Sequence, residues 1–311
     1  MKKIGIAFLL AFVTINGNGQ SLKKHKKSDT QLEHSLLWKI SGNGLQNPSY
    51  LFGTMHLICK QDAGLSENFK LALAHVDKVY FELDLDNVLD MLGAISRMKM
   101  RNDTTLADLL TKADYEKVKS YIEAKKRLLP FNTLQKYKPF VASSMLMEAA
   151  VPCEEQVSME QVIMEQAQKN KKKIEGLETT AFQMSILDSI PYKEQAQALL
   201  KMIAEEGTQK AAENEFAVMM KAYKEQDLQK LAQMINADTD GMGKYQDLLL
   251  NNRNKRWVAS LKKIMANHSL MIAVGAGHLP GELGVIKLFQ KEGFTVEAVN
   301  NTIPPKKLKS F

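Results

Sequence analysis

Cysteine is nearly absent from this chain of 311 residues, which contains only Cys59 and Cys153. Neither belongs to a Cys-x-x-Cys pair, which argues against a thiolate zinc site. No cysteine follows the apolar amino-terminal run, so the sequence does not favour a lipid-anchored protein. Two cysteines in a protein that folds in an oxidising compartment are readily interpreted as one disulfide. We predict a Cys59–Cys153 bridge, with two buried free thiols as the alternative.

An excess of positive charge is lacking in the body of the chain, although the formal net charge is +7. Residues 1–27 carry six lysines and residues 306–311 carry three, with no acidic residue in either segment. Without these nine lysines, 33 of the 42 basic residues remain against 35 acidic ones. A nucleic-acid-binding domain needs a basic surface. We therefore expect no nucleic-acid partner, and we interpret residues 21–34 as a basic leader and 304–311 as a basic tail.

Apolar runs long enough to cross a membrane are absent after the first residues of the chain. Two lysines follow Met1, and an apolar run of about a dozen residues then extends to Ile15, which suits a signal-peptide core. A membrane span needs about 20 such residues. Residues 1–20 therefore predict a signal peptide, with an uncleaved anchor as the alternative. We expect an exported protein, periplasmic or secreted, with no stable membrane span after cleavage.

Strand-like and helical patterns alternate from residue 35 onwards. Strand-helix-strand order is typical of α/β proteins with a parallel sheet. We predict one mixed α/β (α+β) domain over residues 35–303, with a central, mostly parallel sheet. Large helical insertions at about 86–170 and 190–250 are expected to form a cap. The pattern predicts strands at 35–40, 49–52, 78–84, 171–180, 270–274 and 293–299, a strongly helical segment at 244–265 and a helix at 281–291.

The motif Gly-x-x-His occurs twice, each time after a strand-like apolar run. Gly53 precedes His56, and Gly275 precedes His278. A strand that stops at a glycine lets the backbone turn sharply and approach a neighbour closely. Glu82 lies at the end of a third predicted strand. If these strands are parallel neighbours, the three side chains meet at the carboxyl edge of the sheet, where ligands bind in open α/β folds.

Two imidazoles and a carboxylate form a common ligand set for a divalent metal that keeps open coordination positions. A metal held by His56, Glu82 and His278 would lower the pKa of bound water and polarise a carbonyl group. Without a metal, one histidine held by a carboxylate would act as a general base. The structural alternative is that both histidines only donate hydrogen bonds to loop carbonyls.

Three further polar residues are candidates for the same site. Arg253 and Asn254 lie in a predicted helix before the second motif, where they would hold a substrate carboxylate or stabilise an oxyanion. Glu178 ends the strand predicted at 171–180 and would orient a histidine or act as the base. A surface arginine is the alternative for Arg253, and it is the preferred interpretation for Arg256.

The order of these motifs resembles the TraB/PrgY/GumN family, which includes the TIKI proteins of animals. The resemblance covers about residues 35–300 and implies a fold similar to that of the erythromycin esterase and ChaN-like proteins. It also implies a metal-dependent protease that uses His56, Glu82 and His278, with Arg253 and Asn254 close by. The matching segments are Phe52-Gly-Thr-Met-His56, Tyr80-Phe-Glu-Leu-Asp84, Gly176-Leu-Glu-Thr179 with Gln183, Asn252-Arg-Asn254 with Trp257, and Gly275-Ala-Gly-His278.

The leading hypothesis is an exported metal-dependent hydrolase, most simply a peptidase, that acts on a peptide or protein substrate. Its cofactor would be a divalent metal ion such as Mn, Co or Zn. One alternative is a non-catalytic protein that captures haem or a peptide, because histidine and methionine suit haem iron. The other is a metal-free esterase with a histidine base. No sequence feature indicates an oligomeric state.

Overall fold

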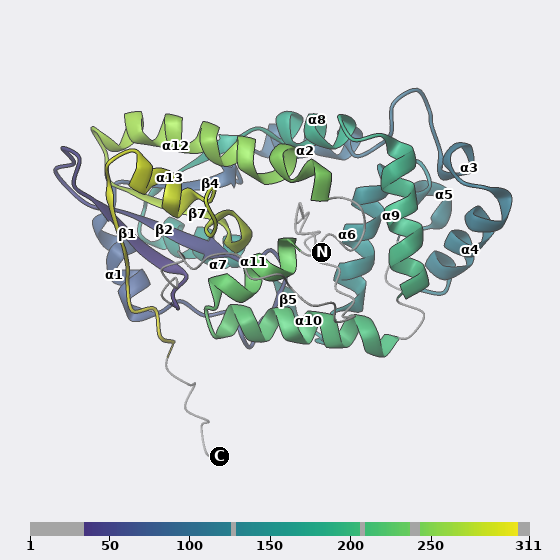
Figure 1. Cartoon of the computed structure of the whole chain (residues 1–311), viewed down its shortest axis with the longest axis horizontal. Coiled ribbons are helices and arrows are strands. Elements are labelled where there is room, and N and C mark those ends of the chain that lie inside the picture. Colours follow the sequence, from purple (N-terminus) through teal and green to yellow (C-terminus); the bar gives the residue numbers. More distant parts are fainter. Residues whose placement is uncertain (1–33, 126–128, 206–208, 237–242, 304–311) are drawn as a thin grey trace, which may run out of the picture.

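The computed structural model describes residues 34–125, 129–205, 209–236 and 243–303. The predicted signal peptide, nearly all of the basic leader and the basic tail lie outside the described residues. Within the described ranges, no helix is long and apolar enough to cross a membrane. Figure 1 shows a sheet with its covering helices at one end of the molecule and a group of helices at the other.

The central sheet has six strands in the order β6-β4-β7-β2-β1-β8. Neighbours among β6, β4, β7 and β2 are parallel, whereas β1 is antiparallel to both β2 and β8. The predicted mixed α/β class with a mostly parallel sheet is therefore confirmed. The strands are β1 (Leu37–Ser41), β2 (Ser49–Thr54), β4 (Lys78–Leu83), β6 (Lys173–Glu178), β7 (Leu270–Gly275) and β8 (Thr295–Ala298).

Strands β2 and β7 bring the two Gly-x-x-His motifs side by side, because Thr54 pairs with Gly275. β7 ends at its glycine as predicted, whereas β2 runs one residue past Gly53. A Cβ atom at Gly53 would lie 3.1 Å from the Ala276 Cα and 3.1 Å from the Leu279 Cδ2. The glycine is thus needed for close approach between the chain after β7 and β2, rather than for ending the strand.

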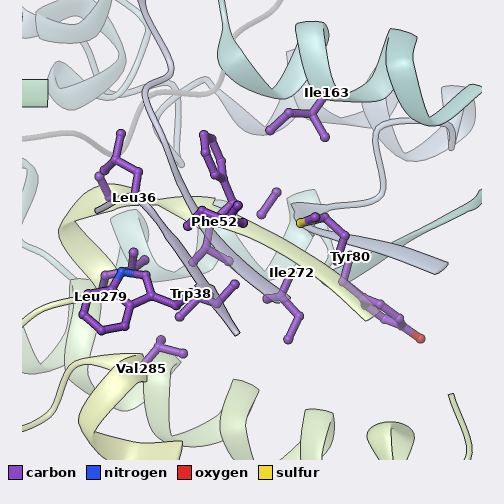
Figure 2. Packing of buried hydrophobic residues seen from close by; sticks show 14 of the residues in the cluster. Leu36, Trp38, Phe52, Tyr80, Ile163, Ile272, Leu279 and Val285 are labelled. Carbon is purple, nitrogen blue, oxygen red and sulfur yellow. The ribbon is translucent and has the colours of Figure 1, made fainter. Parts of the chain in front are cut away.

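Both faces of the sheet are covered, as expected for parallel strands that are apolar throughout. All six positions of β7 are buried. Figure 2 shows Ile163 of α7 (Met159–Lys169) on one side of the strands and Val285 of α13 (Val285–Lys291) on the other, with Phe52 and Ile272 between them.

The helical insertions contribute to more than one hydrophobic core. A second cluster joins residues from 106–146 to residues 196–203, so α3, α4, α5, α6 and α9 form a separate helical body. α10 and α11, in contrast, pack against the sheet core through residues such as Tyr223 and Leu228. The helices are α1 (Glu67–His75), α2 (Val88–Arg97), α3 (Leu106–Leu109), α4 (Lys112–Glu123), α5 (Phe131–Leu134), α6 (Pro139–Ala150), α8 (Thr180–Asp188), α9 (Tyr192–Glu205), α10 (Gln209–Lys224) and α11 (Leu228–Asn236).

Cys59 and Cys153 form a disulfide, as predicted, with their Cα atoms 5.9 Å apart. The bridge lies beside a two-stranded sheet of β3 (Ile58–Cys59) and β5 (Gln156–Val157), which the sequence did not indicate. Together they tie the loop after β2 to the chain that leads into α7.

Two segments expected to be helical differ in detail from the prediction. The segment expected to be helical at 244–265 is divided into a 3₁₀ turn, a π-helical turn at Asp247–Asn251, and α12 (Asn252–Met265). The Leu249 carbonyl in this π turn accepts a hydrogen bond from Arg253 Nη1 at 3.1 Å. The second, expected at 281–291, begins only at Val285, because Gly281 has a φ of 91°.

Candidate functional site

The candidate site lies where the four parallel strands end. His56 follows β2, and His278 lies in the short 3₁₀ turn Ala276–His278 that follows β7. Glu82 is the next-to-last residue of β4, and Glu178 is the last residue of β6. Because the strands are parallel neighbours in the order β6-β4-β7-β2, these four side chains project from one edge of the sheet.

Gly275 forms the floor on which three of these side chains converge. A Cβ atom at Gly275 would lie 3.3 Å from Glu82 Oε1, 3.5 Å from His56 Nε2 and 3.7 Å from His278 Cδ2. All three therefore surround one small space. Glycine is the residue that leaves this space open, since a side chain here would fill it.

The ring of His278 is fixed by Asn254 of α12. His278 Nδ1 donates to Asn254 Oδ1 at 2.6 Å, and the Asn254 amide nitrogen donates to the Leu283 carbonyl at 2.9 Å. This second bond sets the orientation of the amide, so its oxygen faces the ring. The proton of neutral His278 therefore sits on Nδ1. The His278 Nε2 is an acceptor that faces Arg253 Nη1 at 3.4 Å and lies 3.8 Å from Glu82 Oε1.

The ring of His56 is held by Glu160, a residue that the sequence analysis missed. His56 Nδ1 lies 2.7 Å from Glu160 Oε1. Glu160 belongs to the first turn of α7, after the cap residue Ser158. An acidic residue at this position is common because its negative charge interacts favourably with the positive end of the helix dipole. The sequence therefore carries no signal that this carboxylate turns inward toward a histidine.

A buried guanidinium joins the two strand-end carboxylates. Arg253 Nη2 donates to Glu82 Oε2 at 2.6 Å and to Glu178 Oε2 at 2.7 Å, while Nε donates to Glu178 Oε2 at 3.0 Å. Nη1 donates to the Leu249 carbonyl at 3.1 Å. Arg253 is fully buried, and its guanidinium lies 4.7 Å from the centre of the Trp257 ring.

These contacts give Arg253 and Asn254 partners within the protein. Every guanidinium nitrogen of Arg253 is engaged, and so are both polar side-chain atoms of Asn254. Their geometry suits the positioning of Glu82 and His278 better than the direct contact with substrate suggested by the sequence. Gln183 adds a further bond to Glu178, at 3.2 Å.

Charge and burial set the protonation of the site. Burial alone would raise the pKa of Glu82, but Arg253 and the two histidines outweigh it and hold this pKa well below its usual range. Burial, assisted by Arg253, lowers the pKa of His278 to about 3. Burial would also lower the pKa of His56, yet Glu160 and Glu82 raise it to about 9. At neutral pH, Glu82 is ionised and His278 is neutral.

The donor set and the local charge fit a divalent cation that keeps open positions. The carboxylates of Glu82 and Glu178 share the buried cation Arg253, and Glu178 also lies 3.5 Å from the half-exposed Arg256. The carboxylate of Glu160 pairs with His56. In the described part of the chain, no three histidine, cysteine, aspartate or glutamate side chains are already arranged as a metal cage. However, each histidine has its Nδ1 held by an oxygen, which is the usual outer contact of a histidine metal ligand.

Fold and site together define a mixed α/β protein with a polar candidate site at the carboxyl edge of its parallel strands. The model of the TraB/PrgY/gumN family matches residues 36–298, so the chain belongs to this family. The resemblance noted from the motifs is thereby confirmed.

The curated relatives of the chain include animal metalloproteases. Metalloprotease TIKI2 of Danio rerio is 23% identical over 316 residues, covering 85% of this chain and 61% of the relative. Metalloprotease TIKI1 of Xenopus tropicalis is 32% identical over 108 residues, covering 34% of this chain and 20% of the relative. The chain spans about three fifths of the length of relatives such as TIKI2. No solved structure matches the chain.

Proposed function

We propose that this chain is an exported, divalent-metal-dependent hydrolase that cleaves peptide bonds in a peptide or protein substrate. The proposal rests on the two histidines, each with Nδ1 held by an oxygen acceptor, that flank the open space above Gly275 beside ionised Glu82. The names of the relatives as metalloproteases support the same reaction class.

His56 and His278 would hold the metal through their Nε2 atoms, and Glu82 through Oε1. The bound metal would supply a Lewis acid and a water of lowered pKa. Arg253 keeps Glu82 ionised and fixes its Oε2, while the Gly275 N–H donates to Oε1 at 2.9 Å. These two bonds hold the carboxylate over the floor of the site.

The remaining polar residues of the site position or balance the side chains that would bind the metal. Asn254 holds the His278 proton on Nδ1, so the lone pair of this ring is on Nε2, which faces Arg253 Nη1 at 3.4 Å. Glu178 and Glu82 both pair with the guanidinium of Arg253, and Glu178 thereby helps to balance the positive charge of Arg253. For export, the supporting observation is the Cys59–Cys153 disulfide, because such bonds persist in oxidising compartments and are rare in the cytosol.

Metal content is the first test. The purified wild type should contain a divalent metal that is lost in the variant carrying His56→Ala and His278→Ala. His75→Ala is the matched control, since His75 is exposed on α1. Peptidase activity should disappear with a chelator and return when Mn, Co or Zn is added. Equal and negligible metal in the wild type and the double variant would refute the metal site.

The same samples distinguish the two rival functions. Ester hydrolysis that survives the chelator would indicate a metal-free enzyme with a histidine base. A Soret shift in a haem titration that is lost in His56→Ala would indicate a binding protein.

A further inference from the structure

Glu160 is a largely buried carboxylate whose one ion pair within the described ranges is with His56. Its side chain is 13% exposed, and that of His56 is 15% exposed. Burying a charge is unfavourable unless the charge is paired. The ring of His56 is therefore the partner that compensates the buried charge of Glu160.

The backbone around Glu160 is fastened to the loop that carries His56. The Met159 N–H donates to the Met55 carbonyl at 3.0 Å. Just before α7, β5 pairs with β3, and Cys153 is joined to Cys59. The two segments are thus held together on both sides of the contact between the histidine and the carboxylate, which limits the positions that the imidazole ring can take.

The two histidines of the site are held in the same manner from different helices. Asn254 of α12 accepts from Nδ1 of His278, and Glu160 of α7 faces Nδ1 of His56. His56 Nε2 lies toward the space above Gly275, whereas His278 Nε2 faces Arg253 Nη1 at 3.4 Å. The two contacts differ in charge, because an amide oxygen accepts from His278, whereas a carboxylate forms an ion pair with His56.

We propose that Glu160 is a positioning residue for His56, holding Nδ1–H so that Nε2 faces the space above Gly275 as a basic ligand atom. The inference rests on the proposed function, in which His56 binds the metal. A carboxylate behind a ligating histidine fixes the ring and raises the basicity of its free nitrogen. Glu160 itself touches neither metal nor substrate.

The first experiment measures metal affinity by competition with a chromophoric chelator. Glu160→Gln should weaken metal binding by about 10- to 100-fold. Glu165→Gln is the matched control, since it removes the same charge from the exposed face of the same helix, and it should leave Kd unchanged. Glu160→Asp, which keeps the charge, should bind more tightly than Glu160→Gln. Unchanged affinity in Glu160→Gln, when the wild type binds metal, would overturn the inference.

A second measurement needs no metal. In protein with ¹⁵N-labelled histidine, the His56 signals are assigned from their loss in His56→Ala. The wild type should show a downfield Nδ1 proton protected from exchange with solvent, and Glu160→Ala should lose it while far-UV circular dichroism stays unchanged. Identical His56 ring signals in the two proteins would overturn the inference.

The two experiments separate this inference from the proposed function. Wild-type protein without metal refutes the proposed function, yet the ring signals still decide whether Glu160 positions His56. Metal that depends on both histidines but not on Glu160 leaves the proposed function standing and refutes the inference alone.

Discussion

Replacing Arg253 with methionine tests whether this guanidinium balances the charge of the site. Nη2 lies 2.6 Å from Glu82 and 2.7 Å from Glu178, and the two carboxylate side chains are 11% and 4% exposed. Methionine fills similar space without charge, so the variant buries two carboxylates that lose their shared cation. Removing one partner of a buried ion pair costs about 3–5 kcal/mol. We expect the free energy of unfolding to fall by about this amount at pH 7, out of about 5–15 kcal/mol for a typical domain.

Urea denaturation followed by far-UV circular dichroism measures this loss without relying on Trp257, which contacts Arg253. Adding Glu178→Gln to Arg253→Met should restore part of the stability, because one uncompensated charge is then removed. Arg256→Met is the control. This residue is half-exposed on the same helix and 3.5 Å from Glu178, so its removal should cost at most about 1 kcal/mol.

The pH dependence of Arg253→Met follows from burial. Without the guanidinium, burial would raise the folded-state pKa of Glu82 above its unfolded value. A carboxyl group with a raised folded-state pKa stabilises the fold while it is protonated at low pH, and this contribution is lost as the pH rises through the folded-state pKa. The difference between variant and wild type should therefore shrink toward acid pH. A loss below about 1 kcal/mol at pH 7, well short of that for a buried pair, or no recovery with Glu178→Gln, would refute this account of the cluster.

Three other predictions concern the disulfide, the floor of the site and alkaline pH. Cys59→Ser with Cys153→Ser should lower the free energy of unfolding by about 2–5 kcal/mol in urea, and reductant should lower the wild type equally; an unaffected wild type would contradict this. Gly275→Ala places a methyl group between Glu82 Oε1 and His56 Nε2, so elemental analysis of the variant should find no bound metal while the fold is retained. Full metal content in the variant would exclude this space as the metal site. Burial and the hydrogen bond to Asp188 raise the pKa of Tyr192 to about 12, so its contribution to stability is complete below about pH 10 and is lost as pH rises toward 12. Tyr192→Phe should show less loss of stability across that range than the wild type, as measured by denaturation at each pH.

The sequence by itself determined the strands and the positions of the paired motifs. Apolar β-rich runs mark β2, β4 and β7, because strands buried on both faces must be apolar along their length. The strand ends carry His56 and His278, and parallel strands bring their carboxyl ends to one edge. Because the chain has two cysteines, only one intramolecular disulfide was possible, and the structure contains it.

Only the tertiary structure decided which atoms around the histidines face one another. Local periodicity encodes which side of a helix is buried, but it does not encode which distant residue lies opposite. Glu160 has the sequence context of an ordinary acidic helix start, and packing of α7 against the loop after β2 turns it toward His56. Arg253 was expected to meet substrate, whereas the π turn before α12 and two buried strand ends give it partners within the protein. Contacts of this kind depend on the docking of segments far apart in the chain, so no local pattern predicts them.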